Sequence, residues 1–201
     1  MHSVVFDMMG VLYTEGHYIS GLFNDWFGDK ISLEELSRVY IQFAVGEISR
    51  DEFWKHLTSE PDKYEREFFD LMQPMPDLDV IRDLKGKCCL GLLTEMPAEW
   101  IGRMLDKAHL ADFFDVKVVS GIDKLNKPDT AIYELLLSRL PEGGKKIFVD
   151  DRLKNLAPAA ELGFITILMQ GPKLKPQPFK PEHVVQNLAD ARKIIGRILA
   201  E

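Results

Sequence analysis

The chain has 201 residues, of which 46% are hydrophobic and 28% charged, so it carries enough apolar side chains for one sizeable core. Its formal net charge of -7 at pH 7 argues against nucleic acids and anionic membranes as partners. No apolar stretch approaches the length of a membrane-spanning helix, and the first residues lack the pattern of a secretion signal. We therefore expect a cytoplasmic protein, in which the adjacent Cys88 and Cys89 are buried thiols rather than a disulfide.

Short apolar runs alternate along the chain with longer segments in which apolar residues recur at helical spacing. Strands that alternate with helices are typical of a doubly wound parallel sheet. The sequence therefore predicts an α/β fold with a Rossmann-like core. The predicted strands are residues 4–6, 88–93, 116–119, 146–149 and 165–168.

The stretch between the first two predicted strands has a helical pattern throughout and contains no strand candidate. Ser32 and Ser49 are each followed three residues later by Glu, which is the spacing of a capping box at the start of a helix. Gly46 suits the end of the first of these helices. We predict a core domain of residues 1–14 and 81–201 and a small all-helical cap domain of residues 15–80.

Two further helices are predicted in the second half of the chain. One covers residues 129–140, and Pro128 suits its first turn because a missing N–H costs nothing there. The other covers residues 188–199, with Asn187 as its N-cap. Four prolines between residues 171 and 182 argue against regular structure in that segment.

Polar residues with catalytic chemistry follow several of the predicted strands. Asp7 follows the first strand, Thr94 the second and Asp150-Asp151 the fourth, while Lys127 precedes a helix. Ligands of parallel sheets bind at the carboxyl ends of the strands, where these side chains would meet. Each residue alone is also typical of a helix cap or a solvated turn, but their joint order indicates one site.

These segments together resemble the four motifs of the haloacid dehalogenase superfamily, and the resemblance covers nearly the whole chain. The helical stretch after the first motif is similar to the cap of one large subgroup. Residues 46–53 are similar to a cap segment in relatives of α-D-glucose-1-phosphate phosphatase. The matching segments are Val4-Val5-Phe6-Asp7 with Gly10-Val11-Leu12, Leu92-Leu93-Thr94, Lys127-Pro128-Asp129, and Phe148-Val149-Asp150-Asp151 with Asn155, Ala160 and Gly163.

The resemblance implies a role for each polar residue of these motifs. Asp7 would be the nucleophile that forms an aspartyl-phosphate. Thr94 would donate a hydrogen bond to a phosphoryl oxygen, and Lys127 would neutralise the nucleophile and the phosphate. The implied activity is a phosphatase acting on a small phosphorylated metabolite such as a sugar phosphate. The sequence leaves open whether the protein is a monomer or a homodimer.

The resemblance also implies a magnesium ion. Its protein ligands would be Asp7, Asp151 and the backbone carbonyl of Met9, with Asp150 beside them, and such hard oxygen donors suit Mg²⁺. The charges favour a cation as well, because two like charges about 4 Å apart repel by about 4 kcal/mol at an effective dielectric constant near 20. One lysine cannot offset three carboxylates and a phosphate dianion.

Two residues depart from the family pattern. Most phosphatases of the superfamily carry a second Asp two residues after the nucleophile as general acid and base, whereas this chain has Met9. Glu95 stands where relatives often have Asn or a small residue. We expect Glu95 to point outward, toward Arg103 or solvent. The alternative is that it contacts a hydroxyl or a cation of the substrate.

The departures leave two other functions open. A non-catalytic member of the superfamily could bind a phosphorylated ligand or a partner protein at the same residues. A 2-haloacid dehalogenase also lacks the second Asp, but dehalogenases need no metal, so the acidic pair Asp150-Asp151 argues against this activity.

Overall fold

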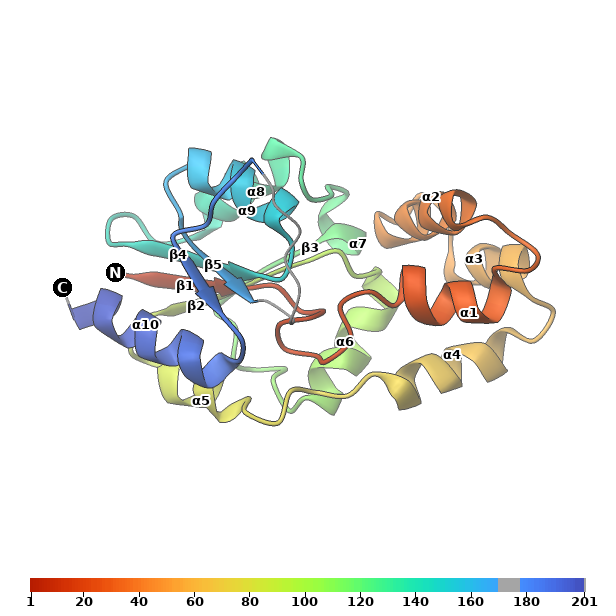
Figure 1. Ribbon diagram of the computed structural model, residues 1–201, viewed down its shortest axis with the longest axis horizontal. Helices are drawn as coiled ribbons and strands as arrows, with labels where there is room; N and C mark the ends of the chain where they lie inside the picture. The colour runs from red at the N-terminus through yellow and green to blue at the C-terminus, as the bar shows by residue number, and fades with distance from the viewer. Residues whose placement is uncertain (170–177, 201) are drawn as a thin grey trace.

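Six parallel strands form one sheet at the centre of the protein. A computed structural model describes residues 1–169 and 178–200 (Figure 1). The strand order is β3-β2-β1-β4-β5-β6, so the chain builds one half of the sheet, returns to β1 and continues on its other side. The prediction of a doubly wound parallel α/β fold is confirmed. The strands are β1 (Ser3–Phe6), β2 (Cys89–Thr94), β3 (Val116–Val119), β4 (Lys146–Asp150), β5 (Ile165–Met169) and β6 (His183–Val185).

The sixth strand is the part of the sheet that the sequence did not predict. Its three residues are too few to show an alternating or continuous apolar pattern. The proline-rich segment predicted to lack regular structure precedes it. Residues 178–182 lie in neither a helix nor a strand, and residues 170–177 lie outside the described part of the chain.

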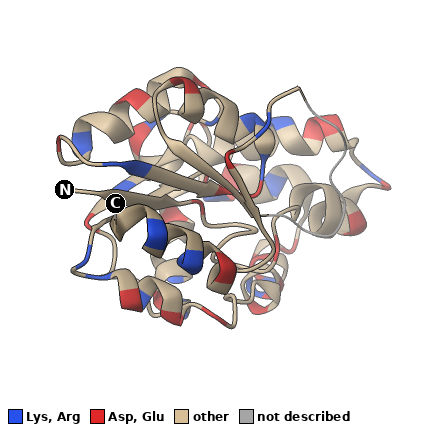
Figure 2. Cartoon of the chain, turned by 60° about the vertical axis from the view of Figure 1, so that its left-hand side comes forward, with Lys and Arg blue, Asp and Glu red and all other residues tan. Residues whose placement is uncertain are grey.

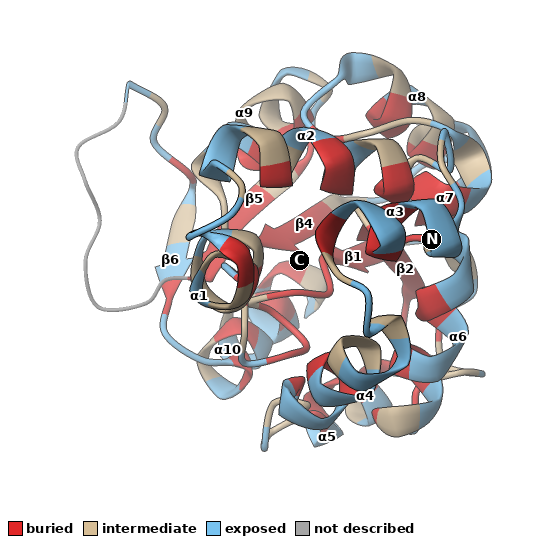
Figure 3. Ribbon diagram, turned by 90° about the vertical axis from the view of Figure 1, so that its right-hand side faces the viewer, coloured by how far each residue is buried: buried red, intermediate tan, exposed pale blue. Residues whose placement is uncertain are grey.

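Helices cover both faces of the sheet. In Figure 1, α8 and α9 lie above the strands and α5 and α10 lie below them. Strands β1 and β2 are buried along their whole length, and β4 is buried at every residue except the half-buried Lys146 (Figure 3). The helices of this part of the chain are α5 (Asp79–Leu84), α6 (Ala98–Lys107), α7 (Ser120–Asp123), α8 (Thr130–Arg139), α9 (Leu153–Glu161) and α10 (Leu188–Ala200).

The two predicted helix starts have different outcomes. Asn187 caps α10 as expected, since its side-chain oxygen accepts a hydrogen bond from the backbone N–H of Asp190 at 2.8 Å. The prediction that Pro128 lies in the first turn of α8 is wrong. Asp129 is the N-cap, with its side chain accepting from the N–H of Ala131 at 3.2 Å, so the helix begins after the proline.

The stretch between β1 and β2 is helical, and none of its residues belongs to a strand of the sheet. Ser49 and Glu52 form the predicted capping box of α3, and Ser32 caps α2. Gly46 adopts a φ of +71° just beyond α2, a conformation that glycine reaches at little cost. We call residues 19–71 the helical insertion, and the division into core and cap domains stays a prediction. Its helices are η1 (Ile19–Phe23, a π-helix), α1 (Asn24–Phe27), α2 (Leu33–Ala44), α3 (Arg50–Leu57) and α4 (Pro61–Leu71).

The helical insertion is anchored on α6 through one aromatic ring and one carboxylate. Trp100 of α6 packs among the aromatic rings of the insertion, with centroids 4.6 Å from Phe68 and 5.0 Å from Phe43. Its indole N–H donates to Glu65 of α4 at 2.8 Å, and Arg50 of α3 pairs with the other carboxylate oxygen at 2.9 Å. This Glu65 hub therefore ties three helices together at a largely buried point.

Charged residues are spread over the outer helices. In Figure 2, the positions of basic and acidic residues are interspersed along these helices. Among the described residues, no helix is both long and apolar enough to cross a membrane.

Candidate active site

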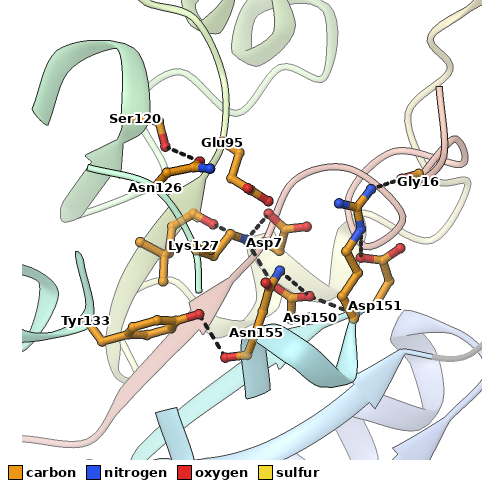
Figure 4. Close-up of polar contacts among 12 residues, drawn as sticks. Asp7, Gly16, Glu95, Ser120, Asn126, Lys127, Tyr133, Asp150, Asp151 and Asn155 are labelled. Atoms are coloured by element: carbon orange, nitrogen blue, oxygen red, sulfur yellow. Dashed lines mark hydrogen bonds and ion pairs between the residues drawn. The ribbon is translucent and has the colours of Figure 1, made fainter. Parts of the chain in front are cut away.

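Lys127 lies buried at the carboxyl ends of the central strands and joins three of them (Figure 4). Its ammonium group contacts Asp7 Oδ1 at 2.7 Å, just after β1, and Asp150 Oδ2 at 2.9 Å, at the end of β4. It also donates to the backbone carbonyl of Leu93 in β2 at 3.3 Å. Because all three donors are used, the lysine holds Asp7 in a fixed position and leaves the second oxygen of that carboxylate open for chemistry.

Asp150 is fully buried and is held by hydrogen bonds on both oxygens. The side-chain amide of Asn155 donates to both of them, at 3.0 and 3.1 Å, and the N–H of Arg152 donates to Oδ1 at 2.8 Å. With the ammonium of Lys127 as a further donor, the carboxylate is well satisfied. These contacts make Asp150 a positioning residue for Lys127, and its role as a metal ligand stays a prediction.

Asp151 is the carboxylate of the cluster that the protein leaves least satisfied. Among residues 1–169 and 178–200, no group forms a hydrogen bond with its buried Oδ1, and Nε of Arg152 lies 3.9 Å from that oxygen. The other oxygen packs against backbone, since a Cβ on Gly10 would lie 2.6 Å from it and a Cβ on Gly16 only 2.5 Å. Gly10 also has a φ of +77°, so glycine is required there both for its backbone conformation and for space.

The structure brings the three carboxylates together as expected. One oxygen each of Asp7, Asp150 and Asp151 lies within 4.8 Å of the others. Two oxygens bound to one Mg²⁺ at about 2.1 Å are at most about 4.2 Å apart, so the cluster is close to the required size. The buried, unpartnered oxygen of Asp151 and the oxygen-only donor set both fit a hard divalent cation.

The electrostatics of the cluster point the same way. Burial raises the pKa of Asp7 to about 7, in part offset by Lys127, and the charges of Asp150 and Glu95 add to the rise. Burial likewise raises the pKa of Asp151 to about 8, helped by the charges of Asp7 and Asp150. Burial lowers the pKa of Lys127, but the two neighbouring carboxylates outweigh it and hold that pKa well above its usual value. The site therefore needs either protons or a cation beyond Lys127.

A pocket of about 330 Å³ opens over Asp7 and Lys127. Thr94, at the end of β2, lines it as expected for a residue that binds phosphate. Met9 lines it too, and its thioether can neither donate nor accept a catalytic proton. The carbonyl of Met9 stays a predicted metal ligand.

Glu95 lines the same pocket, and its carboxylate lies on the side of Asp7 (Figure 4). The expectation that it points outward toward Arg103 is wrong. Arg103 is occupied elsewhere, because its guanidinium lies 3.5 Å from the ring of Phe69 and 3.6 Å from the carboxylate of Glu65. Glu95 therefore adds a negative charge beside the nucleophile.

Sequence reasoning missed several residues of the pocket. Arg152 follows the acidic pair directly and donates from Nη2 to the carbonyl of Gly16 at 2.8 Å, so its position in the motif was the available signal. Tyr40 comes from the helical insertion, and Tyr18 directly precedes it. The hydroxyl of Tyr18 donates to that of Tyr40, which donates to the backbone carbonyl of Glu95 at 3.0 Å. No local sequence pattern reveals these two tyrosines, because tertiary packing brings them to the site.

Comparison with known proteins identifies the family. Residues 1–163 match the haloacid dehalogenase-like hydrolase family. The chain belongs to this family. A curated relative of this hydrolase is the sesquiterpene phosphatase astK of Aspergillus oryzae (strain ATCC 42149 / RIB 40), which is 27% identical over 178 residues, or 81% of this chain and 87% of the relative. The likeness of residues 46–53 to α-D-glucose-1-phosphate phosphatase relatives stays a prediction.

Solved structures share the fold of the hydrolase over nearly its whole length. A haloacid dehalogenase-type phosphatase from Thermococcus onnurineus matches with a TM-score of 0.69 and 23% identity, covering 98% of both chains. The L-2-haloacid dehalogenase of Xanthobacter autotrophicus matches with a TM-score of 0.72 and 16% identity, again over 98% of both chains. At these identities the likeness shows the fold and does not separate the two activities.

Proposed function

We propose that this hydrolase is a Mg²⁺-dependent phosphatase that acts on a small phosphorylated metabolite through an aspartyl-phosphate on Asp7. The observation that carries the proposal is the buried pairing of Asp7 with Lys127 beside the unsatisfied carboxylate of Asp151. A phosphatase among the curated relatives supports it. The acidic cluster favours this function over dehalogenation, because three converging carboxylates suit a bound divalent cation, which the metal-free reaction on a haloacid does not need.

Each of these residues has a part in the proposed reaction. The free oxygen of Asp7 attacks phosphorus, forming a new P–O bond while the ester P–O bond breaks, and the leaving alkoxide takes a proton from water to become the alcohol. Lys127 holds the nucleophile and, with the hydroxyl of Thr94, stabilises the charge on the phosphoryl oxygens. Water then attacks the aspartyl-phosphate, releasing phosphate and restoring Asp7.

Mg²⁺, when bound by Asp7, Asp151 and the Met9 carbonyl, supplies positive charge next to the transferred phosphoryl group. The side chain of Met9 provides no general acid for the leaving oxygen. General acid–base catalysis typically contributes about 10² to 10⁴ in rate, so we expect esters with good leaving groups, such as p-nitrophenyl phosphate, to react fastest.

The test is hydrolysis of p-nitrophenyl phosphate and of a panel of phosphorylated metabolites, with and without Mg²⁺. We expect Asp7→Asn and metal chelation each to abolish turnover. Asp106→Asn, at an exposed position of α6, is the matched control and should keep full activity. Full activity after chelation would overturn the metal assignment.

A non-catalytic binding function is the second candidate, and Glu95 beside Asp7 is the observation that favours it. A carboxylate in that place weakens the binding of a phosphate dianion and so opposes turnover. Binding of phosphate or vanadate without hydrolysis of any ester would support this candidate. Halide release from a 2-haloacid in the presence of a chelator would instead establish dehalogenation.

A further inference from the structure

The wall of the pocket that faces Asp7 comes from the helical insertion and is rich in carbon. Ile19 of η1 and Ile41 and Ala44 of α2 have no polar side-chain atom. Ile41 is 46% exposed and lines the pocket, so part of its apolar surface is open to a bound ligand. We call these three side chains, with Tyr18, Ser37 and Tyr40, the apolar wall.

Each hydroxyl group of the apolar wall donates its hydrogen bond to another group of the protein. Tyr18 donates to Tyr40, Tyr40 donates to the carbonyl of Glu95, and Ser37 donates to the carbonyl of Leu33 at 2.7 Å. A sugar buried against this wall would therefore meet no free hydroxyl donor on it. The hydroxyl oxygens of the wall can still accept hydrogen bonds but offer no proton, so a sugar would find fewer partners here than in water, and each sugar hydroxyl left without a partner would cost about 1 to 3 kcal/mol.

The charged side chains that line the pocket come from the segments around the sheet and not from the helical insertion. They are Asp7 and Lys127, which contact each other, Glu95 after β2, and Arg152 and Lys154 at the start of α9. The pocket is thus divided into a polar end that suits a phosphoryl group and an apolar end that suits hydrocarbon. Its volume of about 330 Å³ is at the small end of ligand sites, which span about 300 to 1,000 Å³.

We propose that the substrate is the phosphate monoester of an apolar alcohol, with its hydrocarbon chain lying against the apolar wall. This inference rests on the proposed phosphatase function and replaces the sugar phosphate expected from the sequence. The recognition is simple in chemical terms. The phosphate is held by charge at Lys127, and the chain is selected because it covers Ile19, Ile41 and Ala44.

The first test compares n-alkyl monophosphates from ethyl to octyl with glucose 6-phosphate. Each methylene that is buried against the apolar wall should raise kcat/KM by about fourfold until the pocket is full, as expected for about 0.8 kcal/mol per CH₂. Glucose 6-phosphate should react more slowly than hexyl phosphate. A kcat/KM that is independent of chain length, or a preference for the sugar ester, would overturn the proposal.

Two substitutions on α2 distinguish the effect of changing a residue of the apolar wall from the effect of changing any exposed apolar residue. Ile41→Gln should lower the ratio of kcat/KM for octyl phosphate to that for ethyl phosphate by about tenfold, since it removes most of one isoleucine contact. Leu33→Gln is the matched control, because Leu33 is 44% exposed on α2 but does not line the pocket. An unchanged ratio in Ile41→Gln, with melting temperatures equal in both variants, would refute the assignment of the wall.

Binding of n-alkylphosphonates tests the wall without relying on catalysis. These probes keep the phosphate-like head and cannot be hydrolysed as esters. Their Kd, measured by calorimetry, should fall by about fourfold per methylene. If no ester is hydrolysed but Kd falls with chain length, the phosphatase function is refuted and the role of the apolar wall is supported. If esters are hydrolysed but Kd does not change with chain length, the phosphatase function is supported and the role of the apolar wall is refuted.

Discussion

The acidic cluster should make the metal-free protein less stable as the pH rises, which is opposite to the usual behaviour of carboxylates. Folding raises the pKa of Asp7 to about 7 and that of Asp151 to about 8, from an ordinary value near 3.8. Between these limits the native state therefore holds protons that the unfolded chain has lost. The free energy of unfolding is greatest when the pH is below the pKa values of these groups in the unfolded chain. It falls as the pH rises, until the pH passes their pKa values in the folded protein.

The magnitude follows from the number of protons. Each proton bound only by the native state contributes about 1.4 kcal/mol per pH unit, and the cluster holds between one and two near pH 6 to 7. The free energy of unfolding should therefore fall by about 2 kcal/mol per pH unit in this range. Mg²⁺ replaces the protons, so its stabilising effect should grow with pH and reach about 2.7 kcal/mol at about a hundredfold excess over Kd.

Urea denaturation at about pH 6 and about pH 8, with chelator or with Mg²⁺, measures both effects. Asp151→Asn should be more stable than the natural chain at the higher pH in chelator, and should lose the response to Mg²⁺. Asp106→Asn, on the exposed side of α6, controls for the substitution itself. A chelated protein that is at least as stable at the higher pH as at the lower would refute this account of the cluster.

Three further substitutions test neighbouring contacts. Lys127→Met leaves two buried carboxylates without their cation and should lower the free energy of unfolding by about 3 to 5 kcal/mol, measured by urea denaturation. Gly10→Ala should reduce the affinity for Mg²⁺, measured by calorimetry, because its Cβ displaces Asp151, whereas Gly143→Ala has a similar positive φ with open space around it and should not. Glu95→Gln removes a negative charge beside Asp7 and should tighten vanadate binding by on the order of tenfold, and unchanged binding would contradict the orientation of Glu95.

The sheet and the acidic cluster could be predicted from the sequence because short segments of consecutive residues indicate them. Asp7 directly follows a continuous apolar strand, and Thr94 and Asp150 end two others. The rule that parallel strands present their carboxyl ends at one edge then places these side chains together without knowledge of any contact. The same rule could not reveal how Lys127 divides its hydrogen bonds among three strands.

The features that could not be predicted depend on packing between distant segments. Arg103, the expected partner of Glu95, contacts Glu65 and Phe69 of α4 instead, and no pattern around residue 95 indicates this. The pairing of Tyr18 with Tyr40 follows from the way η1 lies against α2. The three-residue strand β6 is defined by its neighbour β5 rather than by its own composition.

The Glu65 hub limits how the hydrolase can be rebuilt by exchanging segments. A graft of residues 15–80 alone into another protein of this fold would leave the indole of Trp54 and the guanidinium of Arg50 on a carboxylate that has lost its bond to Trp100. The rings that surround Trp100 would face an unrelated helix at the same time. The smallest transplant that keeps its own interior intact therefore extends through α6, although that helix packs beside the sheet and is separated from the insertion by β2 along the chain.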